Sequence, residues 1–419
     1  MTDHLEYKAQ VFLALGVSLA WCLNPFLSIF LILFVIAKYA LGAGTMRYLL
    51  LLMAASIGLI AYTTKSIALI DTDVVRYGYI FDALTEVSTL QDWALSIYLE
   101  GDLNPGFQLI NFALAKLFPS NSQVLFLFWV TVTYFFSLLM FHTIIDVNDK
   151  KERRKLALLL LLTLAGFVSF GRATDSIKQS AATAIFGYGI ARELMKKGRV
   201  WLVMICAILV HMSALILLPI FLGMRSQWVR RYLVVIFLFC TLLSFVNIVE
   251  VLGMVASVIP GIPEAISYKL TAYTDYESPA SIRILMTFLV YVFMVLLVFL
   301  HYRKWRTYDE KTVLTMQVVA LCVLLVNKGN PHNFMRYVYG YAPFIGLAFY
   351  SFISYRDWKK NEMIWVAVIL AGYIVYANIS YAMAFMDPAT NYANSYVDNS
   401  LFNLLTYTAS DYLNYRVIY

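Results

Sequence analysis

The sequence predicts an all-α polytopic membrane protein with about 10–12 transmembrane helices, re-entrant and short helices among them. Of its 419 residues, 61% are hydrophobic and only 14% are charged, whereas a soluble domain averages about 25% charged residues. Many apolar runs reach about 18 residues or more, the length at which a helix crosses the hydrocarbon core of a bilayer. We therefore treat 1–419 as a single integral-membrane domain. Chain length does not predict the number of domains in such a helical bundle.

The net charge of +7 does not indicate a nucleic-acid partner. The positions of the Lys and Arg residues indicate how the chain is oriented in the membrane. The cations gather in short segments between apolar runs, namely Lys150–Lys155, Lys196–Arg199, Arg225 with Arg230 and Arg231, Arg303–Arg306, and Arg356 with Lys359 and Lys360. Short basic loops stay on the cytoplasmic side. The four cysteines lie in apolar runs, and no Cys/His spacing suggests a metal site. We expect no metal and no cofactor.

The first apolar run covers about 9–41 and contains Asn24-Pro25, so it forms either one kinked helix or two short ones. The run 46–62 then crosses outward. We expect 63–121 to be a large periplasmic loop with short helices, because acids outnumber bases in it. One of these helices begins at Asn104-Pro105, with Asn as N-cap and Pro at the first helical position.

The span 123–145 returns inward, and 156–171 and 177–194 form a hairpin whose outer end carries Arg172. The run 200–223 admits two interpretations. As a re-entrant pair of half-helices with His211 near the tip, it keeps every later basic loop inside, and broken backbone at depth is tolerated where it lines a protein cavity. As an ordinary span, it violates the charge rule once.

The rest of the chain alternates between the two sides of the membrane. We expect a second periplasmic loop at 250–280 and a periplasmic, tyrosine-rich C-terminal tail at 385–419. The remaining spans are expected at 232–249, 282–301, 312–327, 334–355 and 362–384.

Arg172 opens the first candidate site, because an ionisable group next to apolar runs is costly and normally marks a functional cavity. On one continuous helix a polar stripe would lie within about 100°, made of Arg172, Asp175, Ser176, Gln179 and Thr183. Lys178 points elsewhere. The alternative is that Arg172 pairs with Asp175 and only caps an outer loop.

Three further groups extend the candidate site. Asp73 would stack with Arg76 and Tyr77 on one helix face and supply an outer carboxylate as general base; the alternative is an N-cap with a surface salt bridge. His211 lies in an apolar run, either as a donor or proton carrier or as a core histidine with one hydrogen bond. Later in the chain, a helix is expected to begin at Asn330-Pro331, and His332, Arg336 and Tyr339 share one of its faces. Arg283 lies at the outer end of the expected span 282–301, on the same side of the membrane.

A second arginine at the outer side matters because two arginines and helix N-terminal amides suit a pyrophosphate. The alternative for the Arg336 segment is a capped loop with one interfacial arginine. 

The order of these motifs resembles the EpsG/Wzy-type polysaccharide polymerase family through most of the chain. The matching motifs are Asn24-Pro25, Asp73 with Tyr77 and Phe81, Asn104-Pro105-Gly106-Phe107, Arg172 with Lys178-Gln179-Ser180, His211-Met212-Ser213-Ala214 with Pro219, and Arg336. The pair formed by the Arg172 and His211 segments is the most specific of them. Asn104 departs from the family, which often has Glu there, so Asp102 or Asp73 would have to serve in any catalytic role of that Glu, or the position is only a cap.

The resemblance implies a GT-C-like enzyme of the bacterial inner membrane with its active site facing the periplasm. Such enzymes, which serve O-antigen, lipopolysaccharide and exopolysaccharide biosynthesis, transfer a growing glycan from undecaprenyl pyrophosphate to the nonreducing end of a lipid-linked repeat unit. The implied partners are these lipid-linked oligosaccharides, the bilayer and a Wzz-like, chain-length-regulating co-polymerase.

With that substrate, the catalytic residues are expected to be Asp73, Arg172 and His211. Arg172 and Arg336 would bind the pyrophosphate with Lys178 or Arg283 as helpers, Asp73 would be the base, and His211 and Gln179 would orient the substrate. The other expected binding residues are Arg76, Tyr77, Asp175 and His332. The rival functions are a lipid-linked oligosaccharide flippase or other transporter, and a membrane O-acyltransferase with His211 as base.

Overall fold

The computed structural model describes residues 6–64, 73–100, 104–119, 121–246, 251, 308–328 and 400–406, with single positions between 292 and 372. The regular elements of these residues are helices, which confirms the all-α class. The chain divides into two units, each described by itself. Unit 1 comprises Met1–Ala214 with Ala377–Tyr419, and unit 2 comprises Leu215–Tyr376.

Unit 1 begins with two short helices in place of one kinked helix. Helix α1 (Tyr7–Leu23) ends and α2 (Pro25–Lys38) begins on either side of Asn24. Proline cannot donate an amide hydrogen bond to the preceding turn, and the Asn24 Oδ1 accepts from the Leu27 amide at 2.9 Å. The hydroxyl of Ser56, on the following helix, donates to the Pro25 carbonyl at 2.9 Å. The break is therefore held from both sides.

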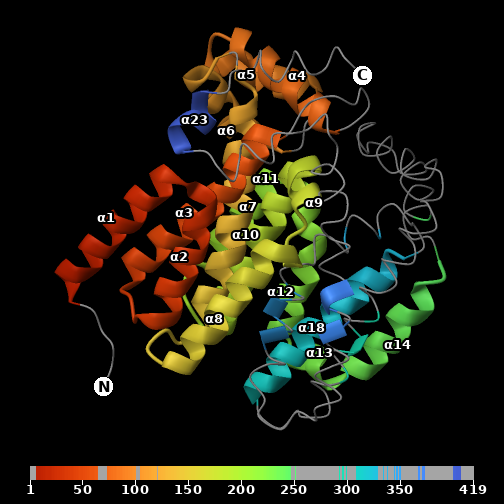
Figure 1. Ribbon diagram of the computed structural model, residues 1–419. Helices are drawn as coiled ribbons and strands as arrows, with labels where there is room; N and C mark the ends of the chain where they lie inside the picture. The colour runs from red at the N-terminus through yellow and green to blue at the C-terminus, as the bar shows by residue number, and fades with distance from the viewer. Residues whose placement is uncertain are drawn as a thin grey trace. The chain divides into compact units, whose positions relative to one another are not determined.

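Helix α7 (Gln123–Ile144) is the centre of unit 1 (Figure 1). It packs along α3 (Ala43–Thr64) on one side and along α10 (Ile177–Leu194) on the other, and α10 in turn packs on α11 (Val200–Val210). Gly58 lets α3 approach closely, because a Cβ at this position would lie 2.6 Å from the Leu127 carbonyl oxygen and would also meet the Thr131 hydroxyl.

Three short helices of the segment 63–121 cover one end of unit 1 (Figure 1). They are α4 (Asp73–Glu86), α5 (Leu90–Glu100) and α6 (Pro105–Leu117). Helix α6 packs on both others, and the Lys116 Nζ donates to the Thr85 carbonyl at 2.9 Å. A further short helix, α23 (Leu401–Thr406), contacts α1.

The basic segment Lys150–Lys155 is helical, whereas the sequence pattern placed it in a loop. It forms the first turns of α8 (Lys150–Leu162), which the Asp149 side chain caps by accepting from the Lys151 amide at 2.7 Å. Arg153 is 1% exposed. Its guanidinium donates to the Lys38 carbonyl at 3.3 Å, so this arginine closes the packing between α2 and α8.

The predicted span 156–171 is also interrupted. After α8 the chain makes one π-helical turn, η1 (Thr163–Phe167), and then a short helix, α9 (Phe170–Asp175). Helix α8 packs on α2 and α7, whereas α10 packs on α7 and α11. The expected hairpin is thus a connection through the Arg172 segment whose two arms have different main partners.

Basic residues from two predicted cytoplasmic segments, Lys150–Lys155 and Lys196–Arg199, gather with Arg47 at the end of unit 1 opposite α4–α6. The Lys197 Nζ donates to the Thr143 carbonyl at the end of α7, at 3.2 Å. Arg153 reaches Lys38, and Arg47 lines the same cavity as Lys197. These residues therefore share one end of unit 1, and the side of the membrane that this end faces stays a prediction.

Unit 2 contains α12 (Leu218–Arg225), α13 (Gln227–Arg231), α14 (Leu233–Leu243) and α18 (Tyr308–Val326). Leu314, Val318 and Cys322 of α18 are buried against apolar residues of α14. A 3₁₀ helix, η2 (Met212–Leu217), joins the two units. The predicted spans at 282–301, 334–355 and 362–384 and the loop 250–280 lie almost wholly outside the described residues, as does the tail 385–419 apart from α23.

Among the described residues, two helices are long and apolar enough to cross a membrane, Ala43–Thr63 and Gln123–Ile144. The shorter apolar helices are Tyr7–Leu23, Pro25–Lys38, Val200–Val210, Met212–Arg225, Leu233–Leu243 and Lys311–Val326. The count of about 10–12 transmembrane helices therefore stays a prediction.

Replacement of Gly58 by alanine should destabilise unit 1 by about 1–3 kcal/mol, because the new Cβ must push α3 away from the α7 backbone. Gly16→Ala on the exposed face of α1, where a Cβ meets no atom within 4 Å, should leave stability unchanged or raise it by up to about 1 kcal/mol. Thermal unfolding of the two variants purified in detergent measures the difference. Equal melting temperatures would contradict the close approach.

Candidate functional site

Arg172 lies in the middle of α9, a six-residue helix held between three others. Helix α9 packs against α4, α7 and α10. The extended residue before it is fixed by the Tyr134 hydroxyl, which donates to the Val168 carbonyl at 3.1 Å. The Ser169 hydroxyl caps the helix at the Arg172 amide. The helices of the first and second sequence constellations are therefore in contact, since α4 begins at Asp73 and contains Tyr77.

The predicted stripe from Arg172 to Thr183 is wrong, because the helix stops at Ser176. Ser176 has φ −112° and ψ 53°, and α10 begins anew at the next residue. The Ser176 amide and the Ser180 hydroxyl both donate to the Arg172 carbonyl, at 2.9 and 3.0 Å. Arg172 and Asp175 consequently belong to α9.

Gln179 and Thr183 form a separate pair on α10, where the Thr183 hydroxyl donates to the Gln179 carbonyl at 2.9 Å. Arg172, Asp175 and Gln179 are all partly buried. They lie on two helices that meet at Ser176, so the polar residues surround a corner and do not follow one face.

Lys178, which the helical stripe excluded, reaches the aromatic residues of α4 and α6. Its Nζ lies 5.6 Å from the ring centroid of Tyr77 and 5.8 Å from that of Phe107. Phe107 stacks on Trp129 of α7 with centroids 4.8 Å apart, and the Trp129 indole donates to the Asn111 Oδ1 at 2.7 Å. An ammonium over aromatic faces is attracted by the ring quadrupoles, so this cluster directs a cation toward α4.

His211 interrupts the run 200–223, as in one of the two interpretations that the sequence left open. Helix α11 ends at Val210, His211 is extended with φ −154° and ψ 121°, and η2 follows. The Asn104 side chain accepts the Met212 amide at 3.0 Å across 108 residues. Asn104 is the N-cap residue of α6 with Pro105 in the first turn, as predicted, but its side chain makes no cap hydrogen bond to α6. This buried amide holds the His211 break against the start of α6.

Close packing supports the same junction. A Cβ on Gly106 would lie 3.0 Å from backbone atoms of Leu209, so glycine allows the first turn of α6 to touch the last turn of α11. The His211 Nδ1 accepts from the Ser213 amide at 3.0 Å. In the neutral imidazole the other nitrogen, Nε2, then carries the proton, which makes His211 a hydrogen-bond donor.

The remaining predicted residues are not described at the level of side chains. Asp73 and Arg76 lie in the first turn of α4, and their side chains are outside the described part of the structure. Arg283, His332 and Arg336 lie outside the described residues altogether. The site that the structure describes thus contains Arg172, Asp175, Lys178, Gln179, His211 and Tyr77 at the junction of α4, α6, α9, α10 and α11.

Sequence reasoning missed the roles of Asn104, Asn111 and Trp129. A weak signal for Asn111 exists, since an amide among the apolar residues of α6 needs a partner when it is buried. Neither the indole partner nor the Met212 amide could be chosen from the pattern alone.

The described residues form a helical bundle in which two helices are long and apolar enough to cross a membrane and polar residues gather at this junction. The model of the EpsG family matches residues 48–394, and the chain belongs to that family. Its members are membrane proteins of the polysaccharide-polymerase type. Neither the curated proteins nor the solved structures contain a match to the chain.

Asn104→Ala should leave the Met212 amide without its acceptor. The local structure around His211 should then lose about 1–3 kcal/mol of stability, the cost of a buried donor without an acceptor. Asn104→Asp retains an acceptor oxygen and should keep most of the stability. Hydrogen–deuterium exchange of peptides that cover 207–215 measures the effect locally. Slow exchange in the alanine variant, equal to that of the wild type, would rule out this hydrogen bond as the tether.

Proposed function

We propose that this protein is a glycan polymerase that acts on lipid-linked repeat units. A growing glycan on undecaprenyl pyrophosphate is the donor, and the nonreducing-end sugar of a second lipid-linked unit is the acceptor. Family membership supports the polymerase class. The observation that carries the substrate is the junction of α9, α10 and α4, where α9 carries Arg172 and Lys178 of α10 lies over the rings of Tyr77 and Phe107.

The reaction needs electrostatic stabilisation more than covalent chemistry. An acceptor hydroxyl oxygen forms a bond with the anomeric carbon of the donor sugar, the bond from that carbon to the pyrophosphate oxygen breaks, and the hydroxyl proton passes to a carboxylate. Fixed positive charge near the departing diphosphate lowers the barrier. In our proposal Arg172 supplies this charge, Lys178 assists it, and Arg336 contributes from the later part of the chain.

Other residues of the junction orient the substrates. Asp73 at the start of α4 serves as the base, with Arg76 beside it. His211 donates through Nε2 to a sugar or phosphate oxygen, and Gln179 fixes the same group from α10. Tyr77 and Phe107 are buried and position the Lys178 ammonium over their rings. This assignment needs no nucleotide-sugar site.

The proposed side of the membrane is the periplasmic face of the bacterial inner membrane. The junction lies at the end of unit 1 opposite the basic residues Arg47, Arg153 and Lys197. Basic segments remain in the cytoplasm, which supports a periplasmic position for the opposite end.

Arg172→Ala should lower the rate of polymer formation by about 10²–10³-fold, in line with the loss of one group that stabilises developing charge. Arg172→Lys should recover part of the rate, because it keeps the charge and loses the planar fork. The assay combines purified protein with lipid-linked repeat units and reads polymer length on gels.

The exposed Arg154 of α8 provides the control, and Arg154→Ala should leave the rate unchanged. Normal ladders from Arg172→Ala would overturn the assignment of Arg172. Movement of lipid-linked units across vesicle membranes without polymer would favour a flippase instead.

Lys178→Gln should raise KM for the lipid-linked unit by about tenfold, which corresponds to the loss of one charged contact. Lys116→Gln is a matched control, because the Lys116 Nζ also lies over an aromatic ring, that of Phe112 at 5.5 Å, and Lys116 belongs to the last turn of α6 whereas Phe107 belongs to the first. Initial rates over a range of substrate concentrations test the pair. Identical KM values for the two variants would exclude Lys178 from the binding site.

A further inference from the structure

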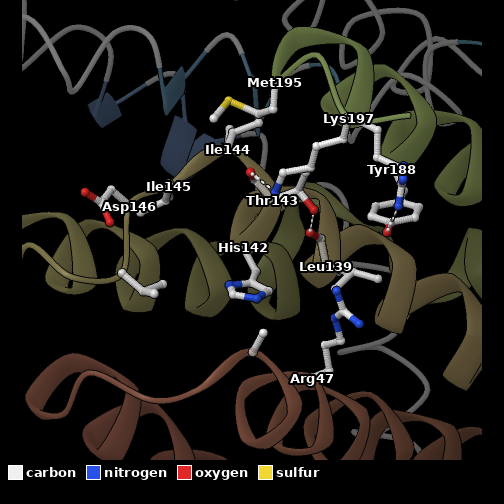
Figure 2. A pocket seen from close by; sticks show the side chains of 13 residues that line it. Arg47, Leu139, His142, Thr143, Ile144, Ile145, Asp146, Tyr188, Met195 and Lys197 are labelled. Carbon is white, nitrogen blue, oxygen red and sulfur yellow. Dashed lines mark hydrogen bonds between the residues drawn. The ribbon is translucent and has the colours of Figure 1, made fainter. Parts of the chain in front are cut away.

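A second site is suggested by a cavity at the end of unit 1 opposite the junction (Figure 2). The cavity has a volume of about 520 Å³. The start of α3, the end of α7, the end of α10 and the two loops that follow form its wall. Lys178 and Arg192 are both on α10, and 14 helical residues separate them by about 21 Å. The cavity is therefore distinct from the proposed polymerase site.

Cations dominate the cavity wall. Arg47, Arg192 and Lys197 line it together with a single carboxylate, that of Asp146. In Figure 2 the Asp146 carboxylate points away from Arg47 and Lys197, while the Arg47 guanidinium extends toward the space beside His142. The cavity thus combines an excess of positive charge with a carboxylate that is turned aside.

Capping of helix ends accounts for part of this charge. The Lys197 Nζ donates to the Thr143 carbonyl at the end of α7, at 3.2 Å. Arg192 donates to the Tyr188 hydroxyl at 3.1 Å and to the Gly198 carbonyl. Cations at the C-terminal ends of helices are favourable in any case. Capping does not account for Arg47, which lies in the first turns of α3, where the helix dipole disfavours a cation.

Two buried polar atoms of residues that line the cavity indicate that the cavity binds a ligand. The His142 Nδ1 and the Arg192 Nε are buried and have no hydrogen-bond partner among the described protein atoms. Buried polar atoms are satisfied in the great majority of cases. Ala43, at the N-terminus of the 22-residue helix α3, also lines the cavity, and the amides at such an end favour anions.

We propose that this cavity binds a phosphate group. Guanidinium groups match phosphate oxygens in geometry and charge, and the imidazole of His142 adds a donor. The apolar side chains of Leu139, Ile144, Ile145 and Met195 line the remaining wall, so the phosphate belongs either to an anionic phospholipid or to a soluble phosphorylated molecule. The cavity lies at the end that the charge pattern assigns to the cytoplasm.

The test uses the full-length protein purified in detergent. Native mass spectrometry after incubation with an equal mixture of phosphatidylglycerol and phosphatidylcholine measures retained lipid. Thermal unfolding in inorganic phosphate, against chloride at equal ionic strength, measures soluble anion binding. A lipid source gives preferential retention of phosphatidylglycerol, and a soluble source gives stabilisation by phosphate without lipid preference.

Arg47→Gln should weaken either signal on the order of tenfold, the effect of losing one charge-assisted hydrogen bond. Arg154→Gln, a change at an exposed arginine outside the cavity, should leave it unchanged. His142→Phe should also weaken binding while the protein stays folded, because it removes the buried Nδ1. The absence of both signals in the wild type, or equal signals in Arg47→Gln and Arg154→Gln, would overturn the proposal.

Discussion

The need to satisfy backbone groups at helix breaks governs the structure of unit 1. Hydrocarbon offers no partner to a released N–H or C=O group, so each break in the apolar bundle recruits a side chain. The Ser56 hydroxyl donates to the Pro25 carbonyl, and the Tyr134 hydroxyl donates to the Val168 carbonyl. The side-chain oxygen of Asn104 accepts from the Met212 amide. The irregular segments are therefore ordered parts of the bundle, and two of them carry the proposed polymerase site.

The same constraint explains why the described candidate residues gather at one end of unit 1. Helix α7 supplies a straight, close-packed axis, to which Gly58 brings α3 within backbone distance. The breaks near Arg172 and His211 leave the regular bundle at the end that α4–α6 cover. Charged side chains at that end meet aromatic rings, as Lys178 does with Tyr77 and Phe107. The opposite end holds the basic cavity, so unit 1 offers two polar regions separated by apolar helix.

Several features were predictable because their causes are local. The interruption of the helix at Asn24-Pro25 follows from the missing N–H group of proline. The start of α6 at Pro105 has the same cause. The charge order along the chain allowed an interruption at His211 but did not decide between it and an ordinary span. The stripe through Arg172 and Gln179 failed, because periodicity assumes a continuous helix and nothing in the pattern shows that Ser176 ends one.

The sequence by itself determined the helical class, the membrane character, the grouping of the basic segments and the identity of Arg172 and His211 as candidates, because composition, apolar length and charge order are properties of the chain alone. Only the tertiary structure decided the partners. Asn104 meets Met212 across 108 residues, Lys178 turns to the rings of α4 and α6, and Arg153 is buried against α2. Such contacts depend on which helices lie side by side. Packing between residues that are distant in the sequence decides this, and local periodicity carries no information about it.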